Sequence, residues 1–193
     1  MATFSKRLQK LLSSTNSITI QSLIDTFAEK SFAVLLLLLL AIPALPLPTG
    51  GVTHIFEIIA MLLSVELLAG RKNVWLPKKW LDKPLPKPLQ SSALSRLIRI
   101  IHWFEKFSKP RFLATQKSWL YPKVIGLIVL MFTIFAFLAP PFSGLDTLPS
   151  LGVVILSLSL IFEDVLLGIV GVIVGSVGIG LVLILGRLAF KLP

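Results

Sequence analysis

Residues 32–70, FAVLLLLLLAIPALPLPTGGVTHIFEIIAMLLSVELLAG, decide the fold. They form an apolar run that is interrupted at residues 43–51 by three prolines and two glycines. The eleven residues before Pro43 are too few to cross a bilayer core, which takes about 20 apolar residues in a helix. The interruption frees backbone N–H and C=O groups that hydrocarbon cannot satisfy. The stretch therefore predicts two helices joined by a break that lies inside protein or against water.

The composition extends this interpretation to the whole chain. Its 193 residues are 55% hydrophobic and 15% charged, with a mean hydropathy of +0.90, which is far more apolar than a soluble domain. We expect an all-α integral membrane protein that forms a single membrane domain over residues 1–193. The chain has no cysteine, which excludes disulfides and thiolate metal sites.

The net charge of +10 is concentrated in residues 71–123, which hold thirteen Lys and Arg against two acids. These bases flank apolar runs, so anionic lipid headgroups and the positive-inside rule explain them better than nucleic acid does. We expect the N-terminus and residues 71–123 to be cytoplasmic, with membrane lipids as partners and no nucleic acid. Residues predicted to lie at the lipid interface are Trp75, Trp80, Arg96, Arg99, Trp103 and Trp119.

Two amphipathic segments accompany the apolar runs. Residues 1–31 form an amphipathic lead, in which Leu23, Ile24 and Phe27 share one helical face that is expected to lie on the membrane surface. Residues 92–109 have an apolar stripe opposite Arg and Lys side chains. This helix either lies flat on the inner leaflet or docks against the first hairpin.

A second unit, residues 124–164, repeats the layout of residues 32–70. An apolar run leads to the break APPFSG at residues 139–144 and LDTLPS at 145–150, and a second apolar run follows. The pattern predicts two related helix–Pro/Gly break–helix units that share one orientation. Whether the hairpins are re-entrant or cross fully stays open at this point.

Residues 165–190 are long enough to cross the membrane and are rich in glycine. Gly171 and Gly175 form a GxxxG motif, which lets two helix backbones approach closely. The motif serves either packing within the monomer or a homodimer.

Charged groups within apolar runs are costly, which makes them candidates for function. His54 and Glu57 are three residues apart and share a helical face directly after the first break. An ion pair with Arg71 would explain Glu66 structurally. The acids of the second unit would pair in the same way with Arg71, Arg96 or Arg99, or else these acids form a substrate or proton site.

The loop Thr49-Gly50-Gly51 precedes a helix and either binds an anion through free N–H groups or caps that helix. No catalytic constellation, metal spacing or cofactor motif stands out, and we expect no cofactor. The ligand-binding candidates are Pro46, Thr49, Gly50, Gly51, His54, Glu57, Glu66, Arg71, Pro140, Pro141, Gly144, Asp146, Glu163 and Asp164.

Several stretches resemble the ExoD family of exopolysaccharide-synthesis membrane proteins. They are LLLLLLAIPALPLPTGG, LLAGR and VWLPKKW in the first half, and KVIGLIVL, PPFSG and IFEDVLLGIVG in the second. The resemblance implies a multi-pass protein of the bacterial inner membrane that works with the exopolysaccharide synthesis machinery. It brings no catalytic residue. His54 and Glu57 depart from the apolar residues that the resemblance leads us to expect there.

Three functions follow as hypotheses. The first is a non-enzymatic membrane protein that supports exopolysaccharide synthesis or export and binds a lipid-linked or anionic ligand at the broken helices. The second is a small secondary transporter or lipid scramblase that uses the acids at the breaks for proton coupling. The third is a membrane-embedded enzyme that acts on polyprenyl-linked sugars.

Overall fold

The computed structural model describes most of the helical part of the chain. The described residues are 6, 9–10, 19–27, 30–45, 52–71, 73–77, 81–82, 99, 101–106, 108, 118–140 and 143–191, without the side chains of residues 52 and 188–191.

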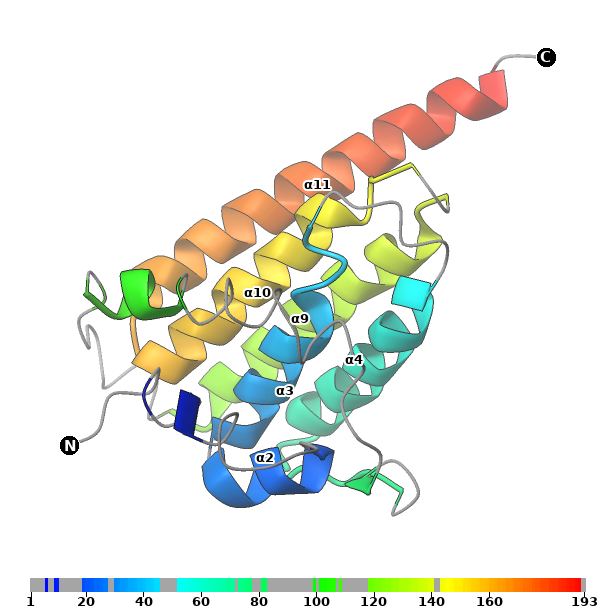
Figure 1. Ribbon diagram of the computed structural model, residues 1–193. Helices are drawn as coiled ribbons and strands as arrows, with labels where there is room; N and C mark the ends of the chain where they lie inside the picture. The colour runs from blue at the N-terminus through cyan, green and yellow to red at the C-terminus, as the bar shows by residue number, and fades with distance from the viewer. Residues whose placement is uncertain are drawn as a thin grey trace.

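These residues form a helical bundle (Figure 1). Its helices are α2 (Ile20–Phe27), α3 (Ser31–Leu40), α4 (Val52–Leu68), α9 (Leu120–Leu138), α10 (Thr147–Phe162) and α11 (Val165–Lys191), and residues 101–106 are helical as well. In Figure 1, α3, α9 and α11 run in one direction, while α4 and α10 run back. The predicted all-helical fold is confirmed.

Helix α3 is the core of the bundle. All ten of its residues are buried, and it packs against α2, α4 and α10. At 1.5 Å per residue it is only about 15 Å long, half the thickness of a hydrocarbon core. A helix that is apolar on every side is satisfied by burial as well as by lipid. The most hydrophobic stretch of the sequence therefore fills the protein interior.

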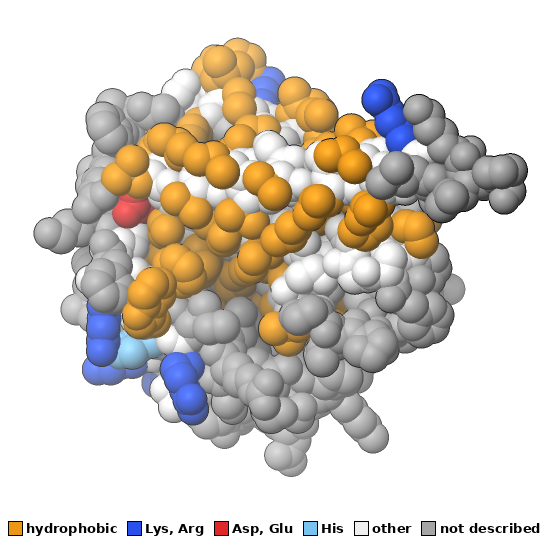
Figure 2. Space-filling view, turned by 90° about the horizontal axis from the view of Figure 1, so that it is seen from above, with side chains coloured by type: hydrophobic (Ala, Val, Ile, Leu, Met, Phe, Trp, Pro, Cys, Tyr) orange, Lys and Arg blue, Asp and Glu red, His pale blue; other side chains and the backbone are white. Residues whose placement is uncertain are grey.

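The outward faces of α4, α9 and α11 carry the apolar surface. Among the described residues, α9 and α11 are the two helices that are long and apolar enough to cross a membrane. Figure 2 looks onto the α11 side, where hydrophobic side chains cover most of the described surface. The larger exposed apolar residues on these faces are Ile55, Ile58, Leu62 and Val65 on α4, Val124, Leu127, Met131, Ile134 and Leu138 on α9, and Ile169, Val170, Ile173, Val177, Leu181, Leu183 and Ile184 on α11.

Glycines bring α10 and α11 into close contact. A methyl group at Gly152 would lie 2.6 Å from the Cα atom of Gly175 and 3.0 Å from the carbonyl oxygen of Gly171. The GxxxG motif thus packs against α10 within the monomer, which confirms the intramolecular alternative. A homodimer through Gly171 and Gly175 is not compatible with this packing, because α10 occupies that face.

The amphipathic segments also pack against protein. Ile20, Leu23 and Phe27 are buried, so α2 turns its apolar face to the bundle and not to the membrane surface. In the second segment Ile101 is fully buried, and the Ser108 hydroxyl donates a hydrogen bond to Asp164 (3.3 Å). This favours docking over a helix that lies flat on the leaflet, although the contact with Asp164 is to the second unit and not to the first hairpin.

The second unit differs from expectation at its break. Helix α10 begins at Thr147, so four residues of the predicted break LDTLPS are helical. Pro149 does not prevent this, because the first turn of a helix has no intrahelical partner for its N–H groups. The two units interlock, since α4 packs against α9 and α10 packs against α3.

Candidate functional site at the helix breaks

Both breaks lie at the same end of the bundle, where α3 ends and α4 begins and where α9 ends and α10 begins (Figure 1). We call this the break end. The opposite end, at which α3, α9 and α11 start, joins the basic segment and is called the basic end. Gly144 has φ +68° in the second break, and the Pro140 carbonyl accepts hydrogen bonds from the Ser143 N–H (3.1 Å) and hydroxyl (2.6 Å). These contacts show that Pro140 and Gly144, two of the predicted ligand-binding candidates, lie in a tight turn.

His54 and Glu57 meet in the first turns of α4. The His54 Nδ1 and the Glu57 Oε2 are 2.8 Å apart, with side-chain exposures of 25% and 0%. The Phe137 ring from α9 lies edge-on to the imidazole, with 5.1 Å between centroids. The Glu57 Oε1 has no hydrogen-bond partner among the described residues. A fully buried carboxyl with one unpartnered oxygen is costly, which sets this pair apart from an ordinary surface ion pair.

Asp146 joins the pair from the other unit. It occupies the N-cap position of α10, although its side chain makes no capping hydrogen bond there. Burial raises the pKa of the Asp146 carboxyl, and the charge of nearby His54 partly offsets that rise. Asp146 also interacts electrostatically with Glu57. The fold thus brings together three predicted site residues from two breaks that are distant in sequence.

The chemistry of this cluster is that of protons and hydroxyl groups. Two carboxyls and one imidazole can exchange protons or hydrogen-bond to a hydroxylated ligand. No group of three or more His, Cys, Asp or Glu side chains in the described part of the chain is arranged to hold a metal ion. Ser150, one turn into α10, adds a buried hydroxyl that lacks a partner within the described residues.

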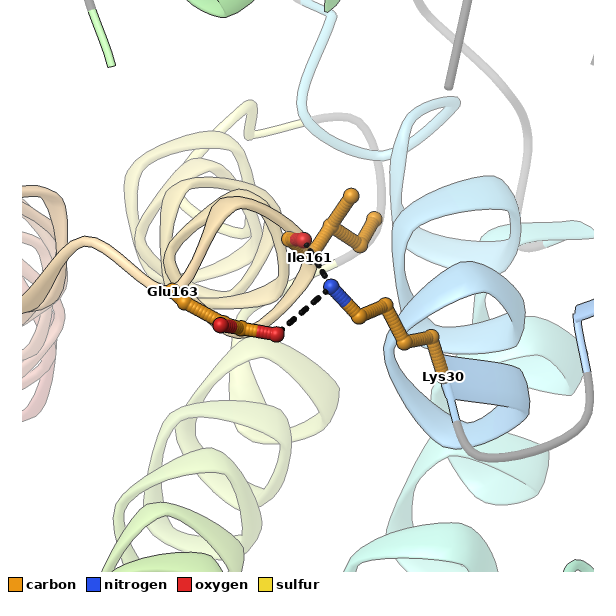
Figure 3. A network of polar contacts seen from close by, with 3 residues as sticks. All are labelled: Lys30, Ile161 and Glu163. Carbon is orange, nitrogen blue, oxygen red and sulfur yellow. Dashed lines mark hydrogen bonds and ion pairs between the residues drawn. The ribbon is translucent and has the colours of Figure 1, made fainter. Parts of the chain in front are cut away.

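Glu163 lies at the basic end and has a structural partner. The Lys30 Nζ donates to the Glu163 Oε1 (3.0 Å) and to the Ile161 carbonyl (2.7 Å), as Figure 3 shows. The predicted pairing of Glu163 with Arg71 or Arg99 is therefore wrong, because Lys30 takes that place. Arg96 lies outside the described residues.

Asp164 is a helix cap. Its Oδ1 accepts the N–H of Leu166 (3.1 Å) in the first turn of α11, and its carbonyl accepts the Ser159 hydroxyl (2.8 Å). A carboxylate at this position satisfies N–H groups that have no intrahelical partner. Glu163 and Asp164 thus join α10 to α11, far from the break end.

Glu66 and Arg71 both lie at the basic end, but their side chains do not form the predicted ion pair with each other. The Glu66 Oε2 accepts the backbone N–H of Trp75 (2.8 Å), while the Arg71 guanidinium lies over the Trp75 ring, 5.8 Å from its centroid. The Lys123 Nζ lies 3.8 Å from the centroid of Trp119. Trp75, Trp103 and Trp119 are all exposed, as residues at a lipid headgroup layer would be.

Several predicted site residues lie outside the described part of the chain. They are Pro46, Thr49, Gly50, Gly51, Trp80 and Pro141. The anion-binding loop and the first Pro/Gly tip thus stay predictions.

Comparison with known proteins identifies the family. The family model described as "Exopolysaccharide synthesis, ExoD" matches residues 4–184. The chain belongs to the ExoD family. It is 29% identical over 156 residues to an uncharacterized protein of Synechocystis sp., which covers 81% of this chain and 72% of that protein. It is 28% identical over 153 residues to Protein ExoD of Rhizobium meliloti, which covers 77% of this chain and 62% of that protein. No solved structure matches.

The sequence did not predict the contacts of three residues of this ExoD-family chain, which are Lys30, Phe137 and Ser150. Lys30 lies directly before the apolar run. This position indicates where a helix starts, but it does not indicate which group the Lys30 side chain contacts. Phe137 is one apolar residue among many. Ser150 gives the best signal, because a hydroxyl in an apolar helix one turn from Asp146 needs a hydrogen-bond partner.

Proposed function

We propose that this ExoD-family chain is an integral membrane protein that supports exopolysaccharide synthesis or export without catalysing a reaction itself. Membership of the family supports the link to exopolysaccharide, and the name of the relative Protein ExoD agrees with it. The apolar faces of α9 and α11 support a place in the membrane. The chain then acts together with the exopolysaccharide synthesis machinery and anionic lipid headgroups in the bacterial inner membrane.

The working site of this proposal is the break end. The observation that carries it is Glu57, a fully buried carboxyl with one oxygen on His54 and one without a described partner. Burying such a group costs free energy, so its presence in a protein core indicates that it interacts with a ligand or a proton during function. The ligand that fits is the hydroxyl-rich head of a lipid-linked saccharide, because sugar hydroxyls can hydrogen-bond to Asp146 and to His54, the partly exposed partner of Glu57.

An anionic ligand is less favoured at the described part of this end. The ionisable side chains described near this end are two acids and one imidazole, and an acid repels an anion when ionised and offers it no positive charge when neutral. Binding of an anion at Thr49-Gly50-Gly51 rests on residues outside the described part. We keep it as the weaker form of the proposal.

The second candidate is a small secondary transporter or lipid scramblase. The His54–Glu57 contact favours it, since an imidazole beside a buried carboxyl is suited to proton exchange. An enzyme acting on polyprenyl-linked sugars would use the same pair as acid and base. That enzyme would also need a reacting group on the ligand within reach of both residues.

The test is exopolysaccharide output from a bacterial strain that lacks this protein and carries a plasmid copy. We expect Glu57→Gln and Asp146→Asn to lower secreted polysaccharide at least several-fold at equal protein levels in the membrane fraction. Asp25→Asn is the matched control, because Asp25 is exposed and bonds only to Gln21 among the contacts described. Normal output from Glu57→Gln at the normal membrane level contradicts the proposed site.

A further inference from the structure

We infer that Glu57 is a proton-binding site that exchanges with water through His54, with Asp146 adjusting its occupancy. The inference rests on the proposal that the break end is the working site, and it names what that site takes up. Its basis is the difference in solvent exposure between two side chains that are in direct contact. His54 is one quarter exposed, Glu57 is fully buried, and 2.8 Å separates them.

Among the described residues near Glu57, apart from His54 and Asp146, no ionisable group is placed to balance its charge. Helices α3 and α9 pack against α4, yet residues 31–40 and 124–138 contain no ionisable side chain. Residues 41–53 and 139–145, which form the two breaks, contain none either. Lys123 of α9 lies against Gly70 at the basic end, and Arg187 is exposed near the end of α11. Within the described part of the chain, His54 and Asp146 are thus the ionisable groups that act on Glu57.

A negative charge on Glu57 would be expensive in this setting. Burying an ionised carboxyl costs far more than burying a neutral one unless hydrogen bonds and counter-charge compensate. Only Oε2 has a described partner, and the nearby Asp146 is itself an acid. A proton is the simplest ligand that removes this cost, because it neutralises the group without requiring further donors.

The proton has a defined route. A water proton binds the His54 Nε2, the ring nitrogen that does not contact Glu57, and gives an imidazolium. The Nδ1–H proton then moves across the 2.8 Å contact to the Glu57 Oε2, which leaves a neutral carboxylic acid and a neutral imidazole protonated at Nε2. One proton enters and charge balances at each step. Phe137 lies against the imidazole ring and limits how much water reaches the pair.

Asp146 couples the second break to this exchange. Its carboxyl acts electrostatically on Glu57, so a charge on Asp146 changes how readily Glu57 holds its proton. Because His54 and Glu57 lie on α4 and Asp146 precedes α10, a change in the separation of the two breaks changes how readily the proton is held. Binding of a ligand between the two breaks would therefore be accompanied by uptake or release of a proton at Glu57.

Infrared spectroscopy of the purified full chain tests this inference. Dodecyl maltoside micelles are suitable because the detergent has no ester carbonyl to mask the C=O band of a protonated carboxyl. Other carboxyls also protonate as the pH is lowered, so the signal assigned to Glu57 is one component of the band, at its high-frequency edge, because the Glu57 Oε1 has no described hydrogen-bond partner. We expect this component in the wild type and in Asp25→Asn, and we expect it to be missing from Glu57→Gln. A folded Glu57→Gln protein that keeps this component, or a wild type that lacks it at every pH at which the protein stays folded, overturns the inference.

Two further variants keep Glu57 in place and test the route. His54→Gln is expected to slow the shift of this component in D2O at least several-fold, and Asp146→Asn to move its midpoint to lower pH, because a negative neighbour is gone. Unchanged exchange and midpoint in both variants contradict the roles assigned here.

The spectroscopic and cellular measurements separate the two proposals. If Glu57→Gln loses this component of the band while polysaccharide output stays normal, the proton site stands and the proposed working site falls. If output falls although the wild type shows no such component, the working site stands and the proton inference falls.

Discussion

Single glycine residues decide how closely α10 and α11 approach. A methyl group at Gly152 would meet backbone atoms of Gly175 and Gly171, whereas one at Gly180 would meet nothing within 4 Å. The two helices can remain in contact only if Gly152 carries no side chain. Backbone atoms cannot rotate away as a flexible side chain can, so the helices themselves would have to separate.

Gly152→Ala is therefore expected to lower the free energy of unfolding by about 1–3 kcal/mol, the usual cost of overpacking. Gly180→Ala is the matched control and should be neutral or favourable by up to about 1 kcal/mol, because alanine is the better helix former. Unfolding by heat or by a denaturing detergent in micelles measures both. Equal stability of the two variants would contradict the close packing.

Asp146 gives a prediction for the pH dependence of stability. Its pKa in the folded state lies above the ordinary value of 3.8 because of burial. The folded state therefore holds this proton more tightly than the unfolded state, so the stability it contributes is present below about pH 3.8 and is lost as the pH rises through the folded pKa. Asp146→Asn should remove that part of the slope.

The measurement is the unfolding free energy of wild type and Asp146→Asn across this pH range. The difference between the two curves isolates Asp146, since the other acids contribute to both. Parallel curves for wild type and Asp146→Asn would mean that Asp146 is as accessible to water in the folded state as in the unfolded state.

At the scale of elements, Glu163 combines a favourable contact with an unfavourable conformation. It has φ 57° in the left-handed region, which costs a residue other than glycine about 1–2 kcal/mol. Its ion pair with Lys30 is partly exposed, at 39% and 43%, so the pair is worth about 0–1 kcal/mol. The strain and the contact thus nearly cancel.

Glu163→Gly should therefore change the unfolding free energy little, because it loses the pair and relieves the strain. Glu163→Ala loses the pair and keeps the strain, so it should be the less stable of the two by about 1 kcal/mol. Lys30 retains the Ile161 carbonyl in both variants. A stability for Glu163→Ala at or above that of Glu163→Gly would contradict this account of the α10–α11 junction.

The buried position of α3 gives another prediction at this scale. Leu36 is fully buried, whereas Ile173 is 58% exposed on α11. Leu36→Ala should cost about 2–5 kcal/mol through lost contacts and a cavity. Ile173→Ala should cost much less, because lipid tails are as apolar as the side chain and fill the space. Denaturing-detergent titration of both variants checks this, and similar losses would place α3 against lipid.

The sequence predicts the helices well and their environments poorly. The predicted runs at residues 32–42 and 165–190 became α3 and α11 with small shifts at their ends. Burial of α3 was not predictable, because a uniformly apolar helix satisfies lipid and protein equally and has no periodicity that marks a face. The spacing of His54 and Glu57 predicted their contact. The approach of Asp146 depends on how α4 and α10 are placed, which no local pattern encodes.

At the scale of the whole molecule, polar groups are divided between the two ends. The break end holds the His54–Glu57–Asp146 cluster, and the basic end holds Lys30, Arg71, Lys123 and the exposed tryptophans. The apolar faces of α4, α9 and α11 lie between them. The predicted duplication stays a prediction. It would account for α4 packing on α9 while α10 packs on α3, since exchanging two equivalent units interconverts these two contacts.

This arrangement predicts sidedness that single cysteines can report, because the chain has none of its own. Asn73 and Ser118 are exposed at the basic end, and Ser143 is exposed in the second break. Helix α9 is about 28 Å long at 1.5 Å per residue, enough to cross the hydrocarbon core. Asn73→Cys and Ser118→Cys should therefore react with an impermeant maleimide from the cytoplasmic side, where basic segments stay. Ser143→Cys should react only from the opposite side. If all three cysteines react from one side, α9 does not cross, and both hairpins enter and leave the membrane on the cytoplasmic face.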